Sequence, residues 1–298
     1  MHLIVCGLAR NLESEIRPTI ERLASNFKKL GDLSVVVVES DSEDKTLDTL
    51  IQMKSEIDSL HVVSLGRLEA RLPNRIDRLS RCRNAYVDYI RNNFTVEDDA
   101  WVCVVDLDGI ASNIPIDEIT LAISSGMADA YTANQEGPYY DIFALRCHGW
   151  VEKDPFLSQR ELMLQGFSEK TAHKKAILDS MKRIPPSSPP VIVDSAFGGL
   201  AVYRMRYFVA SHYSPVNETG LPQCEHVEFS RQFRKSGGRI VIWPKLVIGG
   251  YNQHSRYLHP VRRFFTPLIS LIRRILVKTL GSNKTEKLSQ KIVKRLGI

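Results

Sequence analysis

The sequence lacks the features that mark several common classes of protein. No apolar run approaches the ~18–20 residues of a membrane-spanning helix. The first residues contain no charged region, long apolar segment or cleavage site, so we expect no signal peptide. The absence of G-x-G-x-x-G disfavours a dinucleotide site, and the absence of G-x-x-x-x-G-K-[ST] excludes a P-loop NTPase. We therefore expect a cytoplasmic protein without a membrane span.

Cysteine is also scarce. The five cysteines among 298 residues are widely spaced, and none forms a C-x-x-C pair. Free thiols in a reducing compartment are the simplest interpretation, and metal or disulfide roles are not expected for them. The remaining composition, 43% hydrophobic and 25% charged, is typical of a globular protein, and the length is sufficient for a sizeable core.

Positive charge is concentrated at the C-terminal end. The net charge is +6, yet residues 260–298 hold ten basic residues and one acidic residue, whereas residues 1–259 hold 30 basic and 33 acidic residues. We therefore divide the chain into a domain, residues 1–258, and a basic tail, residues 259–298.

The tail is predicted to form amphipathic helices. Leu268, Leu271 and Ile275 recur at helical spacing, with arginine and lysine opposite. Basic helices of this kind lie in membrane interfaces, where each cation near an anionic leaflet contributes on the order of 1 kcal/mol. We expect the tail to bind an anionic membrane surface and to hold the protein peripherally on its inner face. Packing on the domain and a homodimer contact are the alternatives. Nucleic-acid binding is not expected, because aromatic residues for base stacking are nearly absent.

Hydrophobic patterning predicts an α/β fold. The runs 2–6, 33–38, 61–65, 101–105 and 128–132 resemble strands, and helical patterns fall at 17–29, 45–57, 75–92 and 116–124. This alternation predicts a Rossmann-type, mostly parallel sheet flanked by helices. In the second half, helices are expected at 158–183 and 224–235, and strands at 191–193, 200–203, 239–243 and 246–248.

An acidic pair follows the apolar run at 101–105. Asp106 and Asp108 are two residues apart, so on an extended chain both carboxylates point to the same side, and Gly109 permits a sharp turn. Ligands of open α/β sheets bind at the carboxyl ends of strands. Two carboxylates together with substrate phosphates are typical of an Mg²⁺ or Mn²⁺ site. The alternative is a solvated turn that closes a strand.

Arginines crowd the third predicted helix. A row of cations directed into the acidic site could bind a diphosphate, and the alternative is a solvated face paired with Asp77 and Asp88. The residues concerned are Arg75, Arg78, Arg81 and Arg83.

Several segments, in this order, resemble GT-A glycosyltransferases, and more narrowly the fungal capsule-associated α-1,3-mannosyltransferase family. They are Asn11-Leu12-Glu13, V-E-S-D-S-E-D-K-T at 38–46, R-I-D-R-L-S-R-C-R-N at 75–84, Y-Y-D-I-F-A-L-R at 139–146, S-A-F-G-G-L-A-V-Y at 195–203 and C-E-H-V at 224–227. The resemblance covers roughly residues 3–255. It implies that residues 1–135 hold a nucleotide-sugar and that residues 136–258 form the acceptor side.

The resemblance also implies roles on the donor side. Asp106 would face the ribose and the donor sugar, and Asp108 would ligate the metal that bridges the diphosphate, with His254 as a further ligand. Arg81 or Arg83 would assist. The nucleoside pocket would be lined by Ala9, Arg10 and Glu39, and the backbone at Gly198 and Gly199 would approach the sugar closely. Crowding between elements is the alternative for the two glycines.

On the acceptor side, the resemblance implies that Glu225 contacts the acceptor hydroxyl or the donor sugar. It would act as a general base in an inverting enzyme and would position the substrates in a retaining one. The further acceptor residues would be Tyr139, Tyr140, Asp141 and His226.

The expected function is therefore transfer of a hexose, with mannose as the first candidate, from a GDP- or UDP-sugar to a glycan or lipid-linked acceptor of a surface polysaccharide such as capsule or lipopolysaccharide. A sugar-phosphate nucleotidyltransferase shares such a sheet and metal site, but the G-x-G-T-R-like loop that it requires is missing after the first strand. A non-catalytic membrane- or glycan-binding module is the third alternative.

Overall fold

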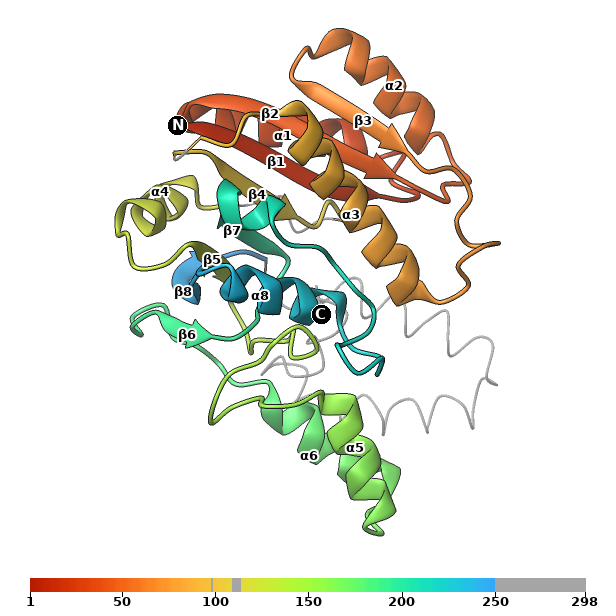
Figure 1. The fold of residues 1–298 in the computed structure, drawn as a ribbon, viewed down its shortest axis with the longest axis vertical. Helices are drawn as coiled ribbons and strands as arrows, with labels where there is room; N and C mark the ends of the chain where they lie inside the picture. The colour runs from red at the N-terminus through yellow and green to blue at the C-terminus, as the bar shows by residue number, and fades with distance from the viewer. Residues whose placement is uncertain (98, 109–113, 250–298) are drawn as a thin grey trace, which may run out of the picture.

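The computed structural model describes residues 1–97, 99–108 and 114–249. These residues form one eight-stranded sheet, in the order β3-β2-β1-β4-β7-β5-β8-β6, flanked by helices (Figure 1). The predicted α/β fold is thus confirmed. The tail at 259–298, His254 and Gly109 lie outside the described residues. In the parts that are described, no helix is long and apolar enough to cross a membrane.

The strands are β1 (His2–Ala9), β2 (Asp32–Glu39), β3 (Leu60–Ser64), β4 (Trp101–Val105), β5 (Ala130–Asn134), β6 (Val191–Val193), β7 (Leu200–Arg204) and β8 (Ile240–Val247). The α-helices are α1 (Ile16–Phe27), α2 (Thr46–Glu56), α3 (Arg75–Asn93), α4 (Ile116–Ser124), α5 (Pro155–Leu164), α6 (Glu169–Ala176), α7 (Met205–Val209) and α8 (Glu225–Lys235). Short 3₁₀ turns occur at Lys28–Leu30 and Leu178–Ser180.

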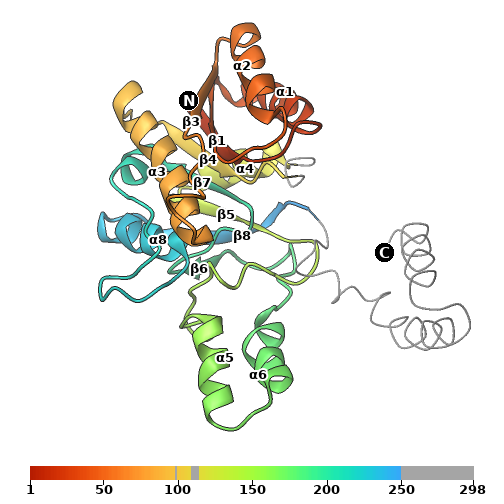
Figure 2. The same ribbon diagram turned by 90° about the vertical axis from the view of Figure 1, so that its right-hand side faces the viewer.

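The first four strands are parallel, and β1, β4 and the second half of β2 are buried on both faces, whereas β3 is a partly exposed edge strand. Side chains alternate along each strand, so Leu3 and Val5 pack on the layer of α1, α2 and α4, whereas Ile4 and Cys6 pack on the layer that contains α3, α7 and α8. Figure 2 shows α3 and α8 on one side of the sheet and α1 and α4 on the other. Strand β1 lies between β2 and β4, so the connections diverge there, and the fold has a topological switch point between β1 and β4.

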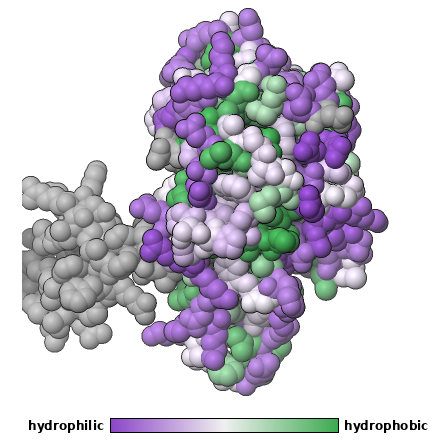
Figure 3. Space-filling view, turned by 90° about the vertical axis from the view of Figure 1, so that its left-hand side faces the viewer, coloured by the Kyte–Doolittle hydropathy of each residue, from purple (hydrophilic) through white to green (hydrophobic). Residues whose placement is uncertain are grey.

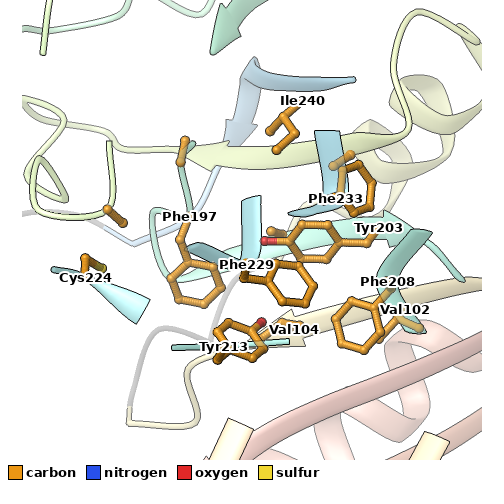
Figure 4. Packing of buried hydrophobic residues seen from close by; sticks show 14 of the residues in the cluster. Val102, Val104, Phe197, Tyr203, Phe208, Tyr213, Cys224, Phe229, Phe233 and Ile240 are labelled. Carbon is orange, nitrogen blue, oxygen red and sulfur yellow. The ribbon is translucent and has the colours of Figure 1, made fainter. Parts of the chain in front are cut away.

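The second half of the sheet is mixed. Strand β7 runs antiparallel between β4 and β5, β8 is parallel to β5, and β6 is antiparallel to β8. Aromatic side chains cover this half (Figure 4). Phe229 of α8 stacks on Tyr213 with ring centroids 4.3 Å apart and meets Tyr203 of β7 edge-on at 5.4 Å. These contacts attach α8, and therefore its first residue Glu225, firmly to the sheet.

Two predicted elements differ in the structure. The helical stretch expected at 158–183 is a hairpin of α5 and α6, which turns at Gly166 with φ +92°. Asp154 caps the start of α5 and Ser168 caps the start of α6, so each helix has its own N-terminal signal. The strands expected at 239–243 and 246–248 form a single strand, β8, that includes Pro244. A register shift opposite it in β5 accommodates the proline.

Candidate active site

A cavity of about 690 Å³ opens at the carboxyl ends of β1, β2 and β4, beside the switch point. Its walls come from segments that are far apart in the sequence. The ends of the three strands contribute Ala9, Arg10, Ser40, Asp41, Asp106 and Asp108; α3 contributes Arg75, Arg78 and Arg83; and the later half contributes Tyr140, Asp141, Phe197, Glu225 and His226. This is the position at which doubly wound α/β sheets bind ligands.

Both carboxylates of the D-x-D motif line this cavity. The backbone N–H of Asp106 donates to the carbonyl of Gly199 at 2.9 Å, which continues the β4–β7 ladder by one residue. Leu107 between them is buried in the core, whereas Asp108 is exposed at the cavity. The alternation of the extended chain thus directs the apolar side chain inward and leaves the two acids at the opening.

A buried arginine lies between the two sides of the cavity. Arg83 extends from α3, and its Nε is 3.2 Å from Glu225 Oε1, while its Nη2 is 3.9 Å from Asp106 Oδ1. The guanidinium also lies over the rings of Phe197 and Tyr213, at 5.3 and 5.7 Å from their centroids. Both members of the Arg83–Glu225 pair are nearly inaccessible, with side chains 8% and 4% exposed, so neither charge is solvated by bulk water.

Negative charge exceeds positive charge around Asp106. Burial in the cavity raises the pKa of Asp106 to about 7; nearby Arg83 opposes the rise, and the carboxylates of Asp108, Asp141 and Glu225 add to it. Burial also raises the pKa of Asp141 above its ordinary value, and the N–H that it accepts from Gly198 offsets part of that rise. Such a cluster favours binding of a cation, because a cation relieves repulsion among the acids.

Glu225 is the first residue of α8, where the helix dipole favours a carboxylate. The adjacent His226 is buried and stacks on Phe197 with centroids 4.2 Å apart. Burial, followed by the charge of Arg83, lowers the pKa of His226 well below its ordinary value. The imidazole is therefore neutral at pH 7.

Gly198 and Gly199 form backbone hydrogen bonds with two acids of the site. Gly198 has φ +71° and donates its N–H to Asp141 Oδ2 at 2.9 Å, while Gly199 accepts the N–H of Asp106. A Cβ on Gly198 would lie 2.7 Å from the carbonyl oxygen of Ala133. The close contact found at Gly198 is with protein backbone, as in the crowding alternative, and the hydrogen bonds of the two glycines hold Asp141 and Asp106 in place.

Of the remaining predicted site residues, some line the cavity and others do not. Glu39 is buried at the end of β2, where its carboxylate accepts hydrogen bonds from the Ser42 N–H and the Ser64 hydroxyl, and the cavity lining does not include it. Arg81 is exposed on α3 outside the lining, and Tyr139 is fully buried against Trp150. Tyr140, next to Tyr139, lines the cavity instead.

Asp41, in the acidic segment at 38–46, lines the cavity, although Glu39 was the acid of this segment that the resemblance assigned to the nucleoside pocket. Asp41 has φ +60°, a backbone conformation that Asp and Asn adopt more readily than most residues. Its carboxylate accepts the N–H of Glu69 at 2.8 Å, and its carbonyl accepts from Arg10 Nε at 3.3 Å. The segment at 38–46 contains several acids, and a linear sequence does not show which of them faces the cavity.

The described residues include no group of three or more His, Cys, Asp or Glu side chains that could hold a metal ion by themselves. Asp106 and Asp108 nevertheless fit a hard divalent cation, because Mg²⁺ and Mn²⁺ sites often use one or two carboxylates and complete their coordination with phosphate oxygens and water. The carboxylates of Asp108, Asp141 and Glu225 near Asp106 also favour a bound cation, because its positive charge would reduce their repulsion.

No family model matches the chain, and no curated protein matches it. Among solved structures, S. aureus TarS 1-349 in complex with UDP-GlcNAc is 15% identical, with a TM-score of 0.48, over 99% of this chain and 72% of that chain. The mannosyltransferase PcManGT from Pyrobaculum calidifontis in complex with GDP-Man and Mn²⁺ is 14% identical, with a TM-score of 0.47, over 94% of this chain and 64% of that chain. GalNAc-T7 with UDP, GalNAc and Mn²⁺ is 14% identical, with a TM-score of 0.49, over 84% of this chain and 44% of that chain. This chain thus spans less than two thirds of the length of the last two proteins. A likeness of this degree assigns no donor, acceptor or reaction to it.

Arg83 and Arg81 provide a matched pair of substitutions. Arg83→Ala leaves Glu225 buried without its cation and is expected to lower the free energy of unfolding by about 3–5 kcal/mol. Arg81→Ala, on the exposed face of the same helix, should change it by no more than about 0.5 kcal/mol. Urea unfolding measures both values. Similar losses in the two variants would show that the buried ion pair does not have this effect.

Asp106→Asn is expected to change the pH dependence of stability. Because the folded pKa of Asp106 is raised to about 7, the folded protein retains a proton that the unfolded chain releases near pH 4, so this group lowers stability as pH rises from about 4 to 7. At pH 8 the free energy of unfolding of the asparagine variant should be higher than that of the wild type by roughly 1–2 kcal/mol, a value reduced for the partial exposure of the carboxylate. At pH 5 the difference should be smaller. Urea unfolding at both pH values, in buffer with a chelator, measures the difference. Asp58→Asn, on the surface, is the control. A difference in unfolding free energy between Asp106→Asn and the wild type that is larger at pH 5 than at pH 8 would contradict the prediction.

Gly198→Ala should destabilise the fold more than Gly220→Ala. Both glycines have positive φ, +71° and +79°, so both variants carry a backbone cost of about 1–2 kcal/mol. Only at position 198 does the new methyl group also meet a backbone oxygen, which should add about 1 kcal/mol or more. Differential scanning calorimetry of the two variants measures the extra loss. Equal melting temperatures would mean that the loop shifts at no cost.

Proposed function

We propose that the chain is a metal-dependent GT-A glycosyltransferase that moves a hexose from a nucleotide-sugar to a glycan or lipid-linked acceptor. The observation that carries this proposal is the convergence of acids at the switch point of the sheet. Asp106, Asp108, Asp141 and Glu225 surround one cavity, which also contains cations and an aromatic wall. Residues 1–135 would provide the donor half of the domain and residues 136–258 the acceptor half.

The donor would lie across the ends of β1 and β4. The cavity of about 690 Å³ falls within the range of small-molecule sites, which is roughly 300–1,000 Å³. Ala9, Arg10 and Asp41 line the side that we assign to the nucleoside. Arg75 and Arg78, at the start of α3, line the cavity and are the cations that we assign to the diphosphate. Arg83 is engaged with Glu225 and Asp106 and would instead position those acids.

Asp106 and Asp108 would hold Mn²⁺ or Mg²⁺, with His254 as the proposed further ligand. When bound, the cation neutralises charge on the departing diphosphate, a Lewis-acid role. Asp106 remains beside the donor because its backbone N–H is fixed by Gly199. This backbone bond, with Arg83 Nη2 at 3.9 Å from Asp106 Oδ1, would hold the residue before any ligand arrives and so reduce the cost of ordering it on binding.

Glu225 would act on the acceptor side of the cavity. In an inverting reaction its carboxylate would take the proton of the acceptor hydroxyl, and in a retaining reaction it would hold the two substrates in position. Arg83 fixes the carboxylate through Oε1. Tyr140 would pack on a sugar ring, and Asp141 and His226 would complete the acceptor wall. Mannose and a surface-polysaccharide acceptor, as in the resembled family, are the specific candidates.

Residues 259–298 would bring the domain to an anionic membrane surface, where a lipid-linked acceptor is found. The support for this part of the proposal is the sequence of the tail, with ten basic residues and one acidic residue in 260–298. Contact with a second copy of the chain is the competing role for the tail.

Donor binding and hydrolysis test the proposal. UDP- and GDP-sugars are screened with Mn²⁺ on the full chain, and the matching donor should stabilise it by about 2.7 kcal/mol at a concentration of 100 Kd. Release of the nucleoside diphosphate should fall at least about 100-fold in Asp108→Ala, because one metal ligand is lost. Asp58→Ala, at an exposed carboxylate outside the cavity, should retain the activity.

Two outcomes would contradict the transferase assignment. In one, no nucleotide-sugar raises the melting temperature above that with Mn²⁺ alone. In the other, the protein releases pyrophosphate from a nucleoside triphosphate and a sugar phosphate, which would instead identify a nucleotidyltransferase.

A further inference from the structure

Helix α5 is rich in apolar residues but buries very little of itself. Six of its ten residues are apolar, and only Pro155 is buried. The large apolar side chains exposed on α5 and in the turn after it are Phe156 (46%), Leu157 (41%), Met163 (43%), Leu164 (89%) and Phe167 (41%). A helix of this composition is normally covered by another surface.

Three of these residues, Met163, Leu164 and Phe167, lie at the far end of a projection. The α5–α6 hairpin extends away from the sheet at one end of the long axis, while α2 lies at the other end (Figures 1 and 2). Figure 3 shows hydrophobic and hydrophilic surface side by side on this lower projection. The turn at residues 163–167 forms its convex tip, with Leu164 and Phe167 on either side of Gly166.

The hairpin also has the opposite charge to the rest of the domain. Residues 155–183 contain six basic and three acidic residues, whereas residues 1–154 and 184–249 together contain 23 basic and 30 acidic residues. Lys170, Lys174 and Lys175 are exposed on α6; Lys175 lies over the ring of Phe167 at the tip, whereas Lys174 pairs with Asp179. An anionic surface would therefore attract this end of the domain and repel the rest of residues 1–249.

We propose that the tip of the α5–α6 hairpin, residues 163–167, inserts into the interface of an anionic lipid bilayer. Apolar side chains at a tip with lysines behind them match the chemistry of that interface, where leucine and phenylalanine enter the acyl boundary and lysine meets the phosphates. A second copy of the chain fits less well, because a stable protein interface needs about 800 Å² from each partner and a convex tip provides little area. This contact is separate from the one proposed for residues 259–298 and does not depend on the chemistry of the cavity.

An environment-sensitive probe at the tip tests the proposal in the full chain. All five native cysteines are buried, so Leu164→Cys introduces one accessible thiol for a nitrobenzoxadiazole label. With vesicles that contain phosphatidylglycerol, the label should shift its emission to the blue and be quenched by spin-labelled lipid. The same label on Ile51→Cys, an apolar residue 57% exposed on α2, should remain in water. Vesicles of phosphatidylcholine alone should bind at least about tenfold more weakly.

Three outcomes would overturn the proposal. The protein could sediment with vesicles while the label at 164 stays in water, which would mean that the tail binds alone. The labels at 164 and 51 could shift equally, which would mean non-specific adsorption. The label at 164 could shift with rising protein concentration in the absence of vesicles, which would mean contact with a second copy.

A charge placed at the tip gives an independent measurement. Leu164→Asp should weaken partitioning into phosphatidylglycerol vesicles at least about tenfold, because an acid replaces an inserted leucine near anionic lipid. Ile51→Asp is the matched control and should leave partitioning unchanged. Thermal melting confirms that both variants are folded, and unchanged partitioning of folded Leu164→Asp would overturn the proposal. Donor hydrolysis without vesicles is measured in parallel, so that failure of the membrane contact and failure of the transferase assignment are distinguished.

Discussion

The buried guanidinium of Arg83 is the contact on which the candidate site depends. It extends from α3 to Glu225 at the start of α8 and to Asp106 after β4, and aromatic rings cover it. Removal of such a charge from water costs several kcal/mol unless partners compensate for it. The three segments must therefore keep their positions together, and one interaction joins the first half of the chain to the second.

Around Asp106, the same cavity has more carboxylates than cations. Asp108, Asp141 and Glu225 line it together with Asp106, and burial, with a smaller contribution from these three carboxylates, raises the pKa of Asp106 to about 7 against the opposing charge of Arg83. Sites that perform chemistry commonly store unfavourable energy of this kind, which a ligand then relieves. The rigid aromatic core around Phe229 and Tyr203 provides the stability that such a site requires.

Local pattern was sufficient for most of the fold. Strand β4 and helix α4 have the bounds that the sequence predicted, because a continuous apolar run and a helical stripe are each read over a few neighbouring residues. Strand β8 was not predicted as one strand. It continues through Pro244 because the amide of Asn134, which is 110 residues earlier, donates to the Pro244 carbonyl at 2.8 Å. A pairing over that distance leaves no periodic signal in the sequence.

The sequence by itself determined that two carboxylates emerge from a buried strand and that arginines gather on one helix. Only the tertiary structure decided which neighbour is used: Arg83 rather than Arg81, Asp41 rather than Glu39, and Tyr140 rather than Tyr139 line the cavity. The physical reason is direction. Adjacent residues of an extended chain, and residues two positions apart on a helix such as Arg81 and Arg83, point to different sides, and the side that becomes the site is set by whichever distant segment packs against it.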